Sequence, residues 1–439
     1  MSSNVSVVSR DDLSPVAGHV SVAYNDALLV YGGYYVTLQL MAPLQRVERY
    51  RDSSLLYVYL TKYDRWLVFK TSGHVPPSNS GCCGVVHHDC LYVFGGFVHD
   101  DDHEHGQGSN KLYRLDLQSL TWTRIPPRRR PRPTPRHKMV GWANSDKLYF
   151  FGGFGPPASS MNNPAVHESQ SVYIDAHGKF DSDHDLPYLS AWNNQLLEFN
   201  LSSETWSAVE TFGDIPASRA AHTVCRVSDH KVIIFGGRHR ETRLNDLYEF
   251  DHRFNIWTQI HPSSLESPCG RSWHAMDAVS PSKFILFGGF TTNNEPLGDV
   301  WELQINANGE WVWHRSAEFD PVPKRRLWHT GVAIGSTLYV YGGCASNIFN
   351  MSQDGNDYCN DLIPIGRNVR PLSALCLSAI AAHRKFDANV LAGCLPETLQ
   401  SRVIFMRKRR NLDESDVMKT RKRCVYNPVK SVCDAAKNL

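Results

Sequence analysis

The sequence predicts an all-β protein, a six-bladed β-propeller followed by a short C-terminal α-helical appendage. Six Gly-Gly pairs, from Gly32-Gly33 to Gly342-Gly343, each follow an apolar or aromatic run. A tryptophan follows five of these pairs, at Trp66, Trp122, Trp206, Trp257 and at Trp311 or Trp313. Strand-rich repeats of roughly 50 residues, each with one glycine pair and one aromatic residue, are typical of propeller blades.

Each repeat is expected to contain four strands. In one complete copy, a strand ends at Gly236-Gly237, a second begins near Asn245-Asp246, and a third opens at Trp257. Double glycines permit the positive φ angles of a tight strand exit. The fourth strand starts near an Arg-x-x-His triplet, at Arg219 to His222, Arg271 to His274 and Arg326 to His329. Because these residues recur at one register, we expect them to make structural hydrogen bonds.

The last repeat lacks an outer strand. The alternating segment from Asn4 to Ser9 has the apolar pattern of a strand. A propeller closed by its own N-terminal strand leaves no unpaired edge between its first and last blades. We therefore expect residues 1–365 to form the propeller, with the N-terminal strand closing the last blade.

Composition restricts the class of protein. The chain has 439 residues, 42% of them hydrophobic, and a net charge of +2, which argues against nucleic-acid or membrane-surface binding by the protein as a whole. The N-terminus lacks the pattern of a signal peptide and no apolar run is long enough to span a membrane, so we expect a cytoplasmic or nuclear protein. The eleven cysteines form no CxxC pair, which favours reduced, buried thiols without metal or other cofactor.

Three irregular stretches interrupt the repeats. The segment from Val98 to His105 is rich in His and Asp, and we favour a solvated loop over a metal site because nothing rigid holds it. The run Pro126–Pro133 is basic and proline-rich, which favours an extended connector over a phosphate contact or import signal. The third repeat is long, with 84 residues from Gly152 to Gly236, and its excess over 156–190 is expected to form an ordered flap with a hairpin near 171–180.

Loops at one mouth of a propeller converge on a central pocket. The residues that follow Gly-Gly, and those that begin the Arg-x-x-His strand, are Tyr34, Lys138, Phe154, Trp192, Arg238, Arg243, Ser272, Trp273, Trp328, Ile348 and Phe349. Aromatic walls with a few basic groups suit an extended chain that ends in a carboxylate. Arg238, Arg243 and Lys138 have no counterparts in the other repeats, which favours a functional role for them.

The repeats resemble kelch repeats from about Gly18 to Ile365. The segments Gly270–His274, Leu286–Thr292, Arg326–Thr330 and Gly342–Ala345 are similar to those of the kelch-domain-containing substrate receptors of cullin-2 RING ubiquitin ligases, which read C-terminal diglycine degrons. The resemblance implies that Arg238, Arg243 and Ser272 hold a terminal carboxylate. It also implies that Lys138, Trp192 and Trp273 surround the terminal glycines, and that Phe154 replaces a tyrosine of the family.

The composition changes from strand to helix after Ile365. Leu372, Cys376 and Ile380 have helical spacing and resemble an elongin-binding box, and the motif at Leu395-Pro396 resembles a cullin-2 box. Residues 366–406 are therefore expected to bind elongin and cullin, and the basic segment 407–439 is expected to be disordered.

The resemblance implies a substrate-recognition subunit of a ligase, with elongin B, elongin C, cullin-2 and proteins ending in glycine as partners, and without catalytic activity of its own. The alternative is a kelch protein-interaction scaffold without ligase association. A propeller enzyme such as a copper oxidase is disfavoured because no ligand set is evident.

Overall fold

The computed structural model describes residues 5–39, 45–99, 107–128, 132–156, 180–182, 190–316, 323–349 and 357–366. The chain divides into two compact units, and residues 4–365 form one of them. The predicted helices of 366–406 and the basic tail lie outside the described residues. Within the described part, the single helix is a 3₁₀ turn, Arg10–Asp12, and no helix there has the length and apolar character needed to cross a membrane.

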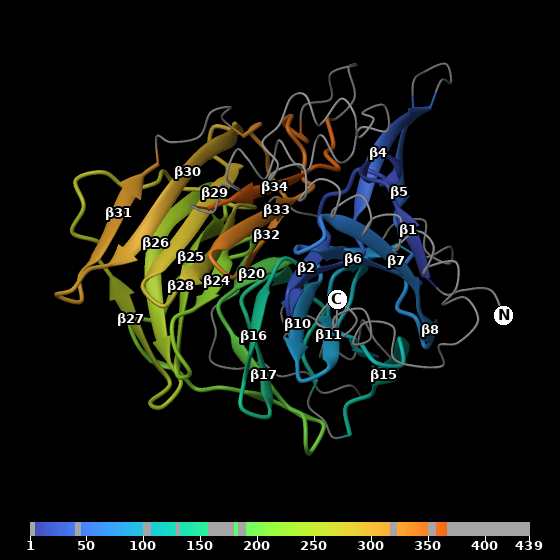
Figure 1. Ribbon diagram of the computed structural model, residues 1–439. Coiled ribbons are helices and arrows are strands. Elements are labelled where there is room, and N and C mark those ends of the chain that lie inside the picture. The colour runs from blue at the N-terminus through green and yellow to red at the C-terminus, as the bar shows by residue number, and fades with distance from the viewer. Residues whose placement is uncertain are drawn as a thin grey trace, which may run out of the picture. The chain divides into compact units, whose positions relative to one another are not determined.

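Six strands, one per blade, form the innermost layer of the propeller (Figure 1). They are β2 (Val20–Tyr24), β10 (Cys83–His87), β16 (Val140–Asn144), β24 (Thr223–Arg226), β28 (Ala275–Ser280) and β32 (Thr330–Ile334). Each contacts the next, and β32 returns to β2, so the ring of blades is closed. The six-bladed prediction is confirmed.

Antiparallel strands extend each blade outward from its innermost strand. The first blade adds β3 (Ala27–Tyr31), β6 (Leu55–Leu60) and β7 (Arg65–Lys70), and the second adds β11 (Cys90–Phe94), β14 (Leu112–Asp116) and β15 (Thr121–Ile125). The third adds β17 (Lys147–Phe151), β21 (Leu196–Asn200) and β22 (Thr205–Ala208), and the fourth adds β25 (Lys231–His239), β26 (Thr242–Asp251) and β27 (Ile256–Ile260). The fifth adds β29 (Lys283–Phe290), β30 (Pro296–Ile305) and β31 (Trp311–Arg315), and the sixth adds β33 (Thr337–Tyr341) and β34 (Leu362–Ile365).

The N-terminal strand does not close the last blade, so this expectation was wrong. Strand β1 (Val5–Val8) pairs with the outermost strand of the first blade, β7, with Val5 opposite Phe69. Among the described residues, β34 pairs with β33 alone. The short strands β8 (Ser72–Gly73) and β23 (Phe212–Gly213) likewise add to outer edges, those of β15 and β27. An added strand therefore covers the outer edge of the first, second and fourth blades.

Tryptophans of the outer strands connect each blade to the one before it. Each packs at a tilt against the aromatic residue that precedes the Gly-Gly pair of the previous blade: Trp122 against Tyr31, Trp206 against Phe94, Trp257 against Phe151, Trp313 against Phe235, and Trp66 against Tyr341, with ring centroids 4.7 to 5.2 Å apart. The last of these pairs joins the first blade to the sixth. Trp313, not Trp311, is the equivalent residue of the fifth blade, because Trp313 packs on Phe235 of the fourth blade, whereas Trp311, on the same face of β31, contacts Phe284 of its own blade.

The Arg-x-x-His arginines have the structural role that their repetition predicts. Arg271 is fully buried and donates to Asp299 Oδ1 at 2.8 Å and to the Gly288 carbonyl at 3.0 Å. Arg219 and Arg326 make the equivalent pairs with Asp246 and Asp361. A buried guanidinium is stable in the fold because its carboxylate partner and the carbonyl satisfy its N–H groups.

The glycine pairs stand where neighbouring blades meet. Gly236 has a φ of +65°, and a Cβ there would lie 2.8 Å from the Arg271 carbonyl oxygen of the next blade. The adjacent Gly237 N–H donates to the same oxygen at 2.9 Å. No other residue type combines this backbone conformation with so close an approach.

Short additional strands follow the Gly-Gly pairs of the first three blades. They are the hairpin of β4 (Tyr34–Gln39) and β5 (Gln45–Tyr50), the sheet of β9 (Asn79–Ser80), β12 (Phe97–Val98) and β13 (Gln107–Gly108), and the sheet of β18 (Phe154–Gly155), β20 (Ala191–Asn193) and β19 (Phe180–Ser182). Most of the expected flap at 156–190 lies outside the described residues, apart from β19, which pairs with β20. Residues 100–106 of the His- and Asp-rich stretch also lie outside them.

Candidate functional site

Six residues, one from each blade, form a closed ring of backbone hydrogen bonds at one mouth of the propeller. Each N–H donates to the carbonyl oxygen of the equivalent residue in the preceding blade, at 2.7 to 3.2 Å. The members are Gly18, Gly81, Lys138, Ala221, Trp273 and Trp328, each two residues before an innermost strand. All six have positive φ angles, between 54° and 65°.

Two tryptophans and a lysine of this ring adopt a backbone conformation that usually belongs to glycine. A bulky side chain at positive φ is strained and persists only where its surroundings hold it. Here the conformation directs Lys138, Trp273 and Trp328 into one cavity. The indoles of Trp273 and Trp328 stack with centroids 5.0 Å apart, and Lys138 Nζ lies 5.3 and 5.2 Å from them. Strain of this kind is typical of functional sites.

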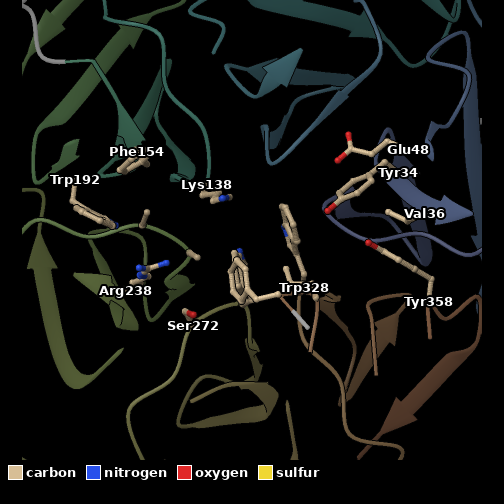
Figure 2. A pocket seen from close by; sticks show the side chains of 15 residues that line it. Tyr34, Val36, Glu48, Lys138, Phe154, Trp192, Arg238, Ser272, Trp328 and Tyr358 are labelled. Carbon is tan, nitrogen blue, oxygen red and sulfur yellow. The ribbon is translucent and has the colours of Figure 1, made fainter. Parts of the chain in front are cut away.

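The cavity at this mouth has a volume of about 450 Å³. Its lining residues come from all blades but the second: Tyr34, Val36, Glu48, Lys138, Phe154, Trp192, Ala220, Ala221, Arg238, Ser272, Trp273, Trp328, Ile348, Phe349 and Tyr358. Figure 2 shows Arg238 and Ser272 on one wall and Glu48, Tyr34 and Tyr358 on the opposite wall. A mainly aromatic cavity with a few convergent polar groups is the usual form of a ligand site.

Arg238 and Arg243 face each other across the two strands of one hairpin. They are cross-strand partners of β25 and β26 beyond the Gly236-Gly237 bulge. Arg243 is 6% exposed, and its Nε donates to Ser272 Oγ at 3.1 Å. Arg238 lies over the Trp192 ring, 5.5 Å from its centroid, and donates through Nε to the Arg240 carbonyl at 2.6 Å. The hairpin thus holds two guanidinium groups beside a buried hydroxyl.

The cations at this wall lack a buried acidic partner among the described residues. Arg238 reaches only Glu241, which is 84% exposed, at 3.6 Å. Burial, and next the charge of Arg238, lower the pKa of Lys138 to about 8 and that of Arg243 to about 10. Three cations around a cavity, none with a buried acidic partner among the described residues, favour an anionic ligand, and arginine side chains suit a carboxylate in particular.

The cavity also offers a hydrogen-bond donor without an acceptor. The Nε1 atom of Trp273 is buried and has no partner among the described residues. Buried indole N–H groups usually find an acceptor.

The structure brings ten of the eleven predicted mouth residues to the cavity wall: Tyr34, Lys138, Phe154, Trp192, Arg238, Ser272, Trp273, Trp328, Ile348 and Phe349. Arg243 lies behind this wall, in contact with Ser272. Sequence reasoning missed Val36, Glu48, Ala220, Ala221 and Tyr358. Ala221 had a signal in the sequence, because it precedes His222 as Trp273 precedes His274. The other predicted set, Leu372, Cys376, Leu395 and Pro396, lies outside the described residues.

One group of metal-ligand types occurs away from the cavity. Nε2 of His87 and of His88 lie 3.7 and 3.6 Å from Asp146 Oδ1, where β10 ends beside the turn between β16 and β17. His88 and Asp146 are exposed.

Comparison with known proteins agrees with this fold. The domain family described as KLHDC2/KLHL20/DRC7 Kelch-repeats domain matches residues 18–280. Kelch domain-containing protein 2 of Bos taurus is 32% identical over 87% of this chain and 88% of its own length. Kelch domain-containing protein 1 of Mus musculus is also 32% identical, over 88% of each chain. The solved structure of YjhT superposes with a TM-score of 0.56 at 16% identity, over 80% of this chain and 95% of that one, which supports the fold alone.

Proposed function

The chain belongs to the KLHDC2-type family of kelch-repeat proteins, and from this we propose that it is the substrate-recognition subunit of an elongin B/C–cullin-2 ubiquitin ligase. Its propeller binds proteins by a C-terminal glycine, and the segment after it binds the ligase. The observation that carries the proposal is the set of three cations around one aromatic cavity with no buried acidic partner among the described residues.

A terminal carboxylate fits the basic wall of the cavity. Ser272 Oγ already accepts the Nε–H of Arg243, so its own hydroxyl proton is available to a carboxylate oxygen. The other guanidinium N–H groups of Arg243 have no acceptor among the described residues, and Arg238 is its cross-strand neighbour. Each charge-assisted hydrogen bond contributes roughly 1.5–3 kcal/mol, enough to separate a free carboxylate from an amide.

The aromatic walls explain a preference for glycine. Phe154 and Trp192 pack edge to face with centroids 4.9 Å apart, and the stacked pair of Trp273 and Trp328 lies across the cavity. Ring faces this close to the basic wall leave little room for a Cβ on the last residues of a ligand. Phe154 lacks the hydroxyl that the family tyrosine carries, so a ligand carbonyl in this chain must rely on other donors.

The attachment to the ligase rests on sequence patterns alone. Residues 366–406 are proposed to bind elongin B and C through Leu372 and Cys376, and cullin-2 through the motif at Leu395-Pro396. Residues 407–439 are proposed to be a disordered tail. Elongins B and C should co-purify with the full chain, and Leu372→Asp or Cys376→Asp should abolish this. A chain that retains its propeller ligand but captures no elongin would favour the scaffold alternative.

The degron proposal is tested with a reporter protein that ends in Gly-Gly. The full chain should capture this reporter from solution and should fail to capture the same reporter extended by one alanine, because the added residue moves the carboxylate away from the arginines. Equal capture of both reporters would show that the propeller recognises an internal surface, as a scaffold would. No enzymatic activity of the chain itself is proposed.

A further inference from the structure

The wall opposite the arginines carries a carboxylate among tyrosines. Glu48 lies in β5 and lines the cavity together with Tyr34 and Tyr358. Figure 2 shows these three side chains on one side of the cavity, across from Arg238 and Ser272. The cavity is therefore charged in opposite senses at its two walls.

Three packed tyrosines lie on the same side of the cavity as this carboxylate. Tyr34 stacks on Tyr50 with centroids 5.6 Å apart and packs edge to face on Tyr358 at 5.9 Å. The Tyr50 hydroxyl donates to Glu48 Oε2 at 3.1 Å, which orients the carboxylate. A carboxylate bordered by tyrosine rings is a good environment for a lysine or arginine side chain, because ion pairing and cation–π attraction act together.

Glu48 forms no ion pair within the described part of the chain. No described lysine, arginine or histidine lies within ion-pair distance of it, whereas Glu198, Glu249 and Glu302 each pair with a lysine of the neighbouring strand. The negative charge at this wall is thus available to a ligand.

A peptide bound in the cavity would run from one wall to the other. If the carboxylate of a ligand lies at Arg238, Arg243 and Ser272, the preceding residues must leave the cavity past another wall. An extended chain advances about 3.3–3.6 Å per residue, so only a few residues separate the two ends of a cavity of about 450 Å³. Residues shortly upstream of the terminal glycines therefore pass Glu48 and the tyrosines.

We infer that Glu48, with Tyr34, Tyr50 and Tyr358, forms a second subsite that selects a lysine or arginine shortly upstream of the terminal glycine. This inference rests on the proposed function, since it takes the arginine wall as the carboxylate site. An acidic residue at the same position of the ligand would be disfavoured by like-charge repulsion. Specificity arises from both effects, attraction for the cationic ligand and rejection of the anionic one.

The experiment measures fluorescence polarisation of labelled peptides that end in Gly-Gly and carry Arg, Gln or Glu at one position from the third to the sixth from the end. On the full wild-type chain, the Arg peptide should bind about fivefold more tightly than the Gln peptide at the preferred position, and the Glu peptide should bind more weakly than both. Glu48→Gln should remove the difference between Arg and Gln. Glu48→Lys should reverse the order of the Arg and Glu peptides.

Controls separate this inference from the function on which it rests. Glu210→Gln removes the same charge from an exposed residue that does not line the cavity, and it should leave the order of the three peptides unchanged. Amidated copies of each peptide report on the carboxylate site. The inference would be overturned if Glu48→Gln still bound the Arg peptide more tightly than the Gln peptide, or if Glu48→Lys left the order of the peptide affinities unchanged. Either result is compatible with binding that depends on the free C-terminal carboxylate, so it would leave the proposed function in place. Equal binding of free and amidated peptides would instead refute the proposed function.

Discussion

Replacing Arg243 by methionine is expected to remove ligand binding without weakening the fold. Arg243 is buried beside Ser272, and burial, together with Arg238, lowers its pKa to about 10. A lowered pKa in a basic group means that the folded protein disfavours its charged form. The residue is therefore retained at some cost to stability, which is typical of a binding residue and not of a structural one.

The size of each effect follows from these contacts. Loss of one charge-assisted hydrogen bond to the carboxylate costs roughly 1.5–3 kcal/mol, so the Kd of a peptide ending in Gly-Gly should rise about 10- to 150-fold. Methionine fills a similar volume and can pack against Phe290, which Arg243 now covers with its guanidinium carbon 4.8 Å from the ring centroid. The free energy of unfolding should then stay within about 1 kcal/mol of the wild type or increase.

Peptide binding and urea unfolding of the same preparations measure the two effects. Arg253→Met is the matched control, because Arg253 belongs to the same blade, is 51% exposed and pairs with Asp251. It should change neither quantity appreciably. A loss of more than about 3 kcal/mol of stability in Arg243→Met would assign Arg243 a structural role, and unchanged peptide affinity would refute its place in the carboxylate site.

Three further outcomes are expected. Because the pKa of Lys138 is about 8, its charge is present below that pH and lost above it. The Kd of the peptide should therefore rise about threefold to tenfold when binding titrations are repeated from pH 7 to pH 9. Lys138→Met should remove most of this pH dependence. Trp257→Ala should lower the free energy of unfolding by about 3–5 kcal/mol in urea melts, since it removes the contact with Phe151 between two blades; a loss below 1 kcal/mol would contradict this packing. Arg271→Met should cost about 3–5 kcal/mol, because it leaves the largely buried carboxylate of Asp299 without its charged partner, and the double variant with Asp299→Asn should recover part of that loss.

The repeat made the fold predictable from the sequence, because a residue that recurs at one register has the same neighbours in every blade. The Gly-Gly pairs and the outer tryptophans therefore gave the number of blades. The choice between Trp311 and Trp313 remained open, since both have the right residue type and lie on the same face of the strand, and only the structure shows which ring reaches Phe235. The position of β1 could not be predicted for a similar reason. Alternation of apolar residues identifies a strand, but the outer edges of the first and last blades offer it similar backbone partners.

Departure from the repeat made part of the site predictable. Arg238, Arg243 and Lys138 occupy positions where other blades have unrelated residues, and the structure brings them around one cavity. Glu48 and Tyr358 were missed because they belong to segments without counterparts in the other blades, where spacing carries no information. The positive φ angles of the ring could not be predicted either. A glycine in the sequence indicates that conformation, whereas a tryptophan does not.

The most direct test of the central claim compares one labelled peptide ending in Gly-Gly with its amidated form and with its Gly-Gly-Ala extension, by fluorescence polarisation on the full chain. The account predicts that the free Gly-Gly end alone binds tightly, and that Arg243→Met weakens it to the level of the amide. Equal affinity for the free and amidated peptides would contradict a carboxylate site at Arg238, Arg243 and Ser272. Failure of all three peptides to bind would contradict it as well, and would favour the scaffold alternative.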